Sequence, residues 1–139
     1  MTTQPGYSTP REMPRTECLD VLPSVPLGRM AGVVDGEPFV LPVNFALFEG
    51  DILIRTNAGT KLHAAITGSV VAFEADHFAN DGLDGWSVLI RGQAREITAA
   101  EELARAQAVE LRTYAYSDSP NRFIRIPTEK MTGRRFDRM

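Results

Sequence analysis

The sequence is poor in cysteine, in long apolar runs and in positive charge, and each absence excludes a class of protein. Among 139 residues there is one cysteine, Cys18, so neither an intramolecular disulfide nor a paired-thiol metal site can form. No apolar stretch could span a bilayer, and residues 1–14 lack the apolar segment of a signal peptide. The formal net charge of −3 gives no overall positive field for nucleic acid. We therefore expect a cytoplasmic protein without a membrane or nucleic-acid partner.

The remaining composition is that of one globular domain. Hydrophobic residues make up 43% of the chain and charged residues 24%, and the length fits a single core. Residues 1–15 contain three prolines and several small polar residues, which bury too little surface to form a core element. We predict a flexible N-terminal arm over residues 1–15 and one folded domain over residues 16–139.

Most of the domain is expected to form antiparallel strands. Asp35-Gly36 and Glu49-Gly50-Asp51 are tight-turn sequences, so the first three strands should form a meander. Short helices are expected over residues 17–22 and 60–66, and a longer one from Thr98, which forms a capping-box sequence with Glu101, to about residue 113. The expected strands are 27–34, 39–48, 52–55, 69–74, 86–97, 123–126 and 131–136.

This order of elements indicates a mainly β protein, a small antiparallel β-barrel with a few short helices. The chain lacks the regular strand–helix alternation of a doubly wound parallel sheet. Two strand segments, Val70–Phe73 and Val88–Ile90, are apolar on both faces. Because a monomer would expose one of those faces to water, a second subunit is the simplest cover.

The segment from Arg55 to Lys61 combines the groups that a phosphate requires. It joins a strand to a helix and contains a guanidinium, two threonine hydroxyls, a glycine and an ammonium. Gly59 lets the backbone approach a ligand, and unpaired amides at a helix start favour an anion. The alternative is an ordinary strand-to-helix turn with two solvated cations. The segment is not a Walker loop, because the required glycine spacing is missing.

Several segments, in order, resemble the pyridoxamine 5'-phosphate oxidase-like family, whose small bacterial members include nitroimidazole-reductase-like proteins. In this family a strand ending in Thr-Asn leads through a glycine to a hydroxyl residue and a basic residue that bind the FMN phosphate. The similar segments are Gly28–Arg29, Leu41–Asn44, Ile54–His63 with Val70–Glu74, Gly85–Ala94 and Thr132–Phe136. The resemblance implies an FMN-binding split β-barrel that forms a homodimer with the flavin at the interface.

The resemblance also implies a set of cofactor-binding residues. On the phosphate side they are Arg55, Thr56, Asn57, Thr60 and Lys61. The strand residues Pro42, Val43, Asn44 and Phe45 would face the isoalloxazine ring, and Ser87 with Trp86 would approach from the neighbouring subunit. Spacing alone assigns no catalytic residue and no set of metal ligands.

The function implied is an FMN-dependent oxidoreductase that passes electrons from a reduced nicotinamide to a small acceptor. Two alternatives stay open: a reductase that uses the deazaflavin F420, and a non-catalytic protein that binds flavin or haem. We do not expect a genuine pyridoxamine-phosphate oxidase, because the C-terminal motif that binds the substrate phosphate is absent. The adjacent Arg134 and Arg135 should point to opposite faces of a strand, so we expect a weakly polar substrate pocket.

Overall fold

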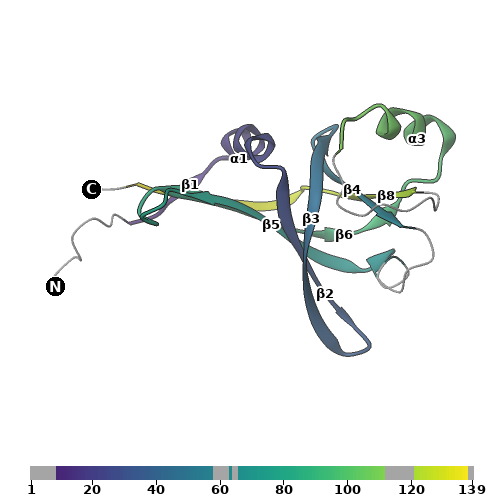
Figure 1. Ribbon diagram of the computed structural model, residues 1–139, viewed down its shortest axis with the longest axis horizontal. Helices are drawn as coiled ribbons and strands as arrows, with labels where there is room; N and C mark the ends of the chain where they lie inside the picture. The colour runs from purple at the N-terminus through teal and green to yellow at the C-terminus, as the bar shows by residue number, and fades with distance from the viewer. Residues whose placement is uncertain (1–8, 58–62, 64–65, 112–120, 138–139) are drawn as a thin grey trace.

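The computed structural model describes residues 9–57, 63, 66–111 and 121–137, and the described strands form one curled antiparallel sheet (Figure 1). The strand order is β1-β9-β6-β5-β2-β3-β4-β8-β7. No described helix is long and apolar enough to cross a membrane. In chain order the elements are β1 (Arg11–Met13), α1 (Arg15–Val21), η1 (Leu22–Ser24), β2 (Leu27–Val34), β3 (Glu37–Phe48), β4 (Asp51–Asn57), β5 (Val70–Phe78), β6 (Gly85–Gln93), β7 (Arg95–Glu96), α3 (Ala100–Gln107), β8 (Asn121–Ile126) and β9 (Lys130–Phe136).

The two expected tight turns connect the first long strands. Asp35 and Gly36 have φ values of 50° and 79°, and Glu49 and Gly50 have 51° and 82°. Paired positive φ angles are those of the hairpin turn whose twist matches the flanking strands. The meander predicted from the sequence is therefore confirmed. The β2–β3 hairpin projects beyond the neighbouring strands (Figure 1).

Strand β3 belongs to two halves of the sheet. Its residues up to Asn44 pair with β2, and from Phe45 onward they pair with β4. At this change of partner the backbone amide of Phe45 and the side-chain amide of Asn44 both donate to the carbonyl of Pro26. The exchange of partners along one strand splits the curled sheet, as expected for a split barrel.

The core lies on the inner face of the sheet. Alternate residues of the central strands point inward, and Met30, Phe73 and Val88 have 0% exposure. Burying each such side chain contributes about 1.5–3 kcal/mol. Gly28 lies directly against the ring of Phe73, where a Cβ atom would overlap the ring. Helix α1 closes one end of the core with the buried side chain of Cys18.

The N-terminal segment differs from the expected arm. Arg11–Met13 form β1, which pairs with β9, and the side chain of Met13 is only 6% exposed in the core. Backbone pairing and one apolar side chain suffice to hold a three-residue edge strand, which composition does not reveal. Residues 1–8 lie outside the described residues.

Several element boundaries also differ. Strand β5 extends to Phe78, beyond the expected end at residue 74, so Asp76 and His77 lie on a strand. The long strand expected over residues 86–97 is interrupted at Ala94, whose amide and carbonyl bond to the turn at residues 68–69. The helix predicted over residues 60–66 is described only at His63 and Ile66, which are both helical.

Helix α3 is shorter than predicted and lacks the expected capping box. It begins at Ala100 after Ala99, whose position has no side-chain cap, and it ends at Gln107. Its buried Ala106 packs against Phe48 and Leu53. This packing sets the position of the helix and leaves Thr98 one residue before the capping position.

Candidate functional site

The end of β4 meets the helical residue His63. The hydroxyl oxygen of Thr56 lies 2.9 Å from Nδ1 of His63, and both side chains are partly buried. Thr56 is the next-to-last residue of β4 and lies opposite Arg122 of β8 in the strand pairing. The junction therefore brings together a hydroxyl and an imidazole from the two sides of the segment predicted to bind phosphate.

His63 continues into a chain of polar contacts. Its Nε2 lies 2.6 Å from Oε1 of Glu96 on β7, and Oε2 of the same carboxylate lies 3.0 Å from the guanidinium of Arg122. The side chains of His63 and Glu96 are 14% and 16% exposed. Because both nitrogens of the imidazole are bonded, the ring is fixed in position. His63 is the centre of a network, which we call the His63 network: Thr56, His63, Glu96 and Arg122.

The other predicted phosphate residues lie next to this network or outside the described structure. The guanidinium of Arg55 lies 5.8 Å from the ring centroid of Phe123, an arrangement that favours a cation. Asn57 is the last residue of β4, where its backbone pairs opposite residue 121. Thr60 and Lys61 lie outside the described residues, so their role stays a prediction.

The residues predicted to face the isoalloxazine divide between the two faces of the sheet. Phe45 is 6% exposed and packs edge-on against Phe73, with ring centroids 4.9 Å apart. Val43 packs against the same core, whereas Pro42 is exposed on the outer face opposite Arg29. Asn44 lies where the barrel splits. The side chains of Val43 and Phe45 are therefore engaged in core packing.

Trp86 and Ser87 also point in opposite directions. Trp86 is 5% exposed and belongs to the core. Ser87 lines a pocket of about 660 Å³ on the outer face, formed by β1, β5, β6 and β9. Of this pair, Ser87 is the residue whose side chain is available to a ligand.

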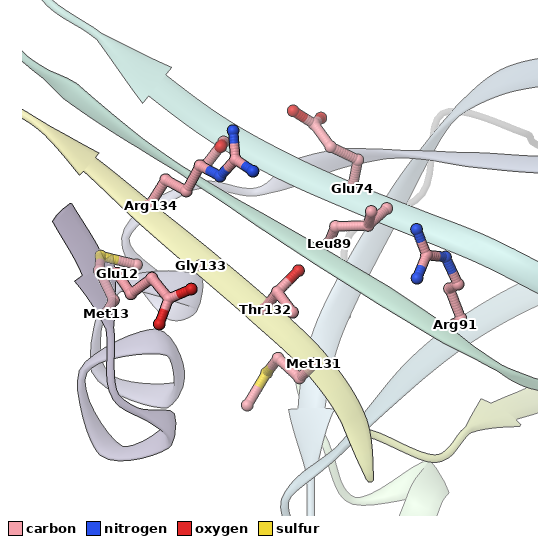
Figure 2. Close-up of a pocket in the computed structure, with 10 residues that line it drawn as sticks. Glu12, Met13, Glu74, Leu89, Arg91, Met131, Thr132, Gly133 and Arg134 are labelled. Carbon is pink, nitrogen blue, oxygen red and sulfur yellow. The ribbon is translucent and has the colours of Figure 1, made fainter. Parts of the chain in front are cut away.

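The outer pocket is more strongly charged than the weakly polar pocket predicted from the sequence. Figure 2 shows Glu74, Arg91 and Arg134 around its central strands, with Thr132 between them. Arg135, the neighbour of Arg134, instead bonds to Glu17 at 2.8 Å. The prediction that the two adjacent arginines face opposite ways is confirmed. The added charge comes from Arg91 and Glu74, for which we had predicted no role.

Glu74 is the titratable group of this pocket with the largest change in pKa. Burial, followed by a hydrogen bond and charge repulsion from Asp76, raises the pKa of Glu74 to about 7. Arg29, at 3.5 Å from Glu74 and 3.6 Å from Asp76, opposes this rise. Glu74 therefore exchanges a proton near neutral pH, as a group in a functional site often does.

The two candidate regions do not meet within one chain. In the sheet order, β5, β2 and β3 lie between β6, which carries Ser87, and β4, which carries Thr56. The outer face between them exposes Val33, Val40 and Val70 at 64%, 65% and 72%, together with the charged group of Arg29, Glu74 and Asp76. No group of three or more His, Cys, Asp or Glu residues in the described structure is arranged to hold a metal ion.

The sequence did not reveal Glu96 and Arg122 as part of this site, because strand pairing and not a sequence motif brings them there. Glu96 and Arg122 are far from Thr56 in the chain, and neither belongs to a recognisable motif. Their convergence depends on β8 pairing with both β4 and β7. A signal for this pairing would need strand register, which a single sequence does not supply.

Comparison with known proteins identifies the family. The family model described as pyridoxamine 5'-phosphate oxidase matches residues 14–135. The chain belongs to the pyridoxamine 5'-phosphate oxidase family. It is 38% identical to the FAD-binding protein from Mycobacterium smegmatis, with a TM-score of 0.80 over 91% of this chain and 99% of that one. The fold is therefore the flavin-binding split barrel of this family.

Two further similar proteins differ in their sequence identity to this chain. An uncharacterized protein of Mycobacterium tuberculosis is 35% identical over 101 residues, which are 69% of this chain and 66% of that protein. The FAD- and haem-binding protein from M. smegmatis is 16% identical, with a TM-score of 0.67 over 95% of this chain and 73% of that one. At that identity the second similarity concerns the fold alone.

Proposed function

We propose that this chain binds a flavin nucleotide and acts as an oxidoreductase, passing electrons from a reduced nicotinamide to a small acceptor. The observation that carries the proposal is the junction after β4, where the hydroxyl of Thr56 lies beside the imidazole of His63 and opposite Arg122 across the strand pair. Hydroxyl and guanidinium groups are the donors that a phosphate requires. Family membership and the similarity to an FAD-binding protein support a flavin as the molecule that carries this phosphate.

The phosphate in question is the one at the end of the ribityl chain. FMN, FAD and F420 all carry a phosphate at that position, so the donors of the β4 junction fit each of them. FMN is the ligand we propose first, with Thr60 and Lys61 completing the phosphate site together with Asn57. The strand from Pro42 to Phe45 would present backbone groups to the polar edge of the ring.

We further propose that the functional unit is a homodimer. The exposed valines of the outer face support this assembly, because a large apolar surface on a monomer is unfavourable in water. A two-fold axis would bring Ser87 of one subunit towards the phosphate junction of the other, which joins the two regions that one chain keeps apart. The projecting β2–β3 hairpin would be covered by the same contact.

The flavin supplies the hydride and electron transfer, and the chain positions it and excludes water. In the outer pocket, Arg91 and Arg134 would attract an anionic group of the electron donor or acceptor. Glu74, with a pKa of about 7, holds a proton at the pocket wall at lower pH. Ser87 offers a hydroxyl as donor or acceptor.

Oxidation of pyridoxamine phosphate is not part of this proposal. A second phosphate would need clustered cations, and Arg91 and Arg134 do not form one cluster. Arg134 lies opposite Ser87 in the strand pairing, four positions from Arg91. At about 3.3 Å per residue, their backbones are roughly 13 Å apart along the strand.

The visible absorption of the protein purified from cells tests the proposal. We expect flavin bands, bleached when NADH or NADPH is added without oxygen and restored by an acceptor such as a nitroimidazole. A Soret band would favour a haem-binding protein, and bound flavin that neither nucleotide reduces would favour a carrier. Turnover of pyridoxamine phosphate at about 1 per second or faster would contradict the exclusion of that substrate.

A further inference from the structure

The His63 network connects the proposed phosphate site to an imidazole that can take up a proton. A neutral imidazole donates at one ring nitrogen and accepts at the other, whereas a charged imidazole donates at both. His63 is bonded at both nitrogens, to Thr56 at 2.9 Å and to Glu96 at 2.6 Å. The protonation state of the ring therefore determines the direction of the hydrogen bonds on either side of it.

The bond to Glu96 fixes the position of the first ring hydrogen. A carboxylate only accepts, and that of Glu96 also accepts from Arg122 at 3.0 Å. Nε2 of His63 must therefore carry a hydrogen in both the neutral and the charged ring. In the neutral ring Nδ1 is then bare, and it accepts the hydrogen of the Thr56 hydroxyl.

Protonation reverses the second bond. In the charged ring Nδ1 carries a hydrogen and donates it to the oxygen of Thr56. The hydroxyl hydrogen of Thr56 is then released and can be donated to another acceptor. A phosphate oxygen accepts such a hydrogen, so Thr56 can act as a phosphate donor only when His63 is charged.

We propose that His63 couples the binding of the flavin phosphate to the uptake of one proton from solvent, by determining whether Thr56 can donate to that phosphate. The inference depends on the proposed function, because it takes Thr56 as a phosphate ligand. Phosphate binding favours the charged ring, and by linkage the charged ring favours phosphate binding. His63 is thus a positioning residue that makes flavin affinity sensitive to pH.

The other charged groups around the ring agree with this account. Glu96 on β7 stabilises the charged ring, and Arg122 on β8 neutralises the second oxygen of that carboxylate. Arg55 on β4 is next to Thr56 in sequence, but strand alternation directs it to the other side, over the ring of Phe123.

The test compares the affinities of FMN and riboflavin from pH 5.5 to 8.5 by quenching of flavin fluorescence. Riboflavin lacks the phosphate, so the ratio of the two dissociation constants isolates the phosphate contribution. In the wild type we expect this contribution to fall by about tenfold as the pH rises from 5.5 to 8.5. The phosphate's own second ionisation, near pH 6, acts in the opposite direction and is common to all variants.

Two variants of the network give opposite expected results. His63→Gln cannot be charged, so it should lose the additional pH dependence that the wild type shows. In Glu96→Gln the neutral ring can carry its hydrogen on Nδ1 and donate it to Thr56, which leaves the hydroxyl hydrogen of Thr56 for the phosphate. The FMN affinity of this variant at pH 8 should therefore rise to the value at low pH. A merely structural role would weaken binding in both variants. Because Glu96→Gln also frees Arg122, the double variant with Arg122→Gln is measured alongside.

The controls separate failure of this inference from failure of the proposed function. His77→Gln changes the other of the two histidines, an exposed residue on β5, and should behave like the wild type. Thr56→Val should lower the phosphate contribution at pH 6. If Thr56→Val lowers the phosphate contribution, but this contribution changes with pH in the same way in the wild type and in His63→Gln, the coupling is wrong. If Thr56→Val changes nothing, the phosphate site itself is wrong, and the coupling with it.

Discussion

Among the residues that the structure describes, Glu74 is the one whose surroundings oppose its ordinary charge most strongly. Burial and the neighbouring Asp76 raise its pKa from 4.5 to about 7. Between these two pH values the unfolded chain has lost the proton and the folded chain keeps it, so the folded state becomes less favourable as the pH rises. The penalty is absent below pH 4.5 and complete above pH 7.

Glu74→Gln should therefore stabilise the protein at high pH and not at low pH. We expect its melting temperature to exceed that of the wild type by about 2–4 °C at pH 8, with the difference vanishing near pH 4. Calorimetry across this range measures it. Glu101→Gln, which removes an exposed carboxylate from α3, is the matched control and should show no such trend. A constant difference between Glu74→Gln and wild type at every pH would contradict the assignment.

Among single residues, the sequence pointed to those that belong to a recognisable motif. It did not point to residues whose importance comes from neighbours on other strands. Thr56 was expected at the phosphate junction, and the structure places it beside His63. Glu96 and Glu74 had no expected role, because their importance depends on neighbours contributed by other strands. A single sequence carries no record of such contacts.

At the scale of secondary-structure elements, a network of ion pairs holds helix α3 to the sheet. Arg125 of β8 contacts Asp51 at 2.7 Å and Glu102 of α3 at 2.8 Å, and its guanidinium lies 4.8 Å from the ring centroid of Phe48. The side chain of Arg125 is only 13% exposed. Hydrogen bonds and charge from Arg95, assisted by Arg125, lower the pKa of Glu102 to about 2.

Arg125→Met should weaken the attachment of this helix to the sheet. Removing the guanidinium leaves two largely buried carboxylates without it, at an expected cost of about 2 kcal/mol in the free energy of unfolding. Arg105→Met is the matched control: its side chain is 52% exposed and its contact with Glu49 lies at the surface, where a pair contributes about 0–1 kcal/mol. Urea denaturation compares the two, and equal losses would contradict the special role of Arg125.

The elements themselves were predicted with uneven success, for physical reasons. The β2–β3 hairpin was predicted because Asp35-Gly36 determines a turn through local backbone geometry. Helix α3 was predicted too long and with the wrong cap, because packing of Ala106 overrides the local capping preference. The break at Ala94 also has no local signal, since it depends on hydrogen bonds to the turn at residues 68–69.

At the scale of the whole molecule, the three exposed valines of the outer face lead to a prediction about assembly. Sedimentation at micromolar concentration should detect a stable dimer. Val40→Lys places a charge on the exposed outer face of β3 and should shift the protein towards monomer. Ala104→Lys places the same charge on an exposed position of α3 and should not. A wild-type monomer at this concentration would contradict both the dimer and the shared site.

The central claim is that this split barrel binds a flavin by its phosphate through the segment after β4. Titration of the apo-protein with FMN, compared with riboflavin, tests it most directly in the wild type and in Lys61→Ala. Loss of a charge-assisted bond costs about 1.5–3 kcal/mol, so we expect Lys61→Ala to weaken FMN binding by about tenfold or more and riboflavin binding little. Lys130→Ala, which removes the other lysine, should leave both affinities unchanged. Equal FMN affinity in wild type and Lys61→Ala, or no saturable flavin binding, would contradict the account.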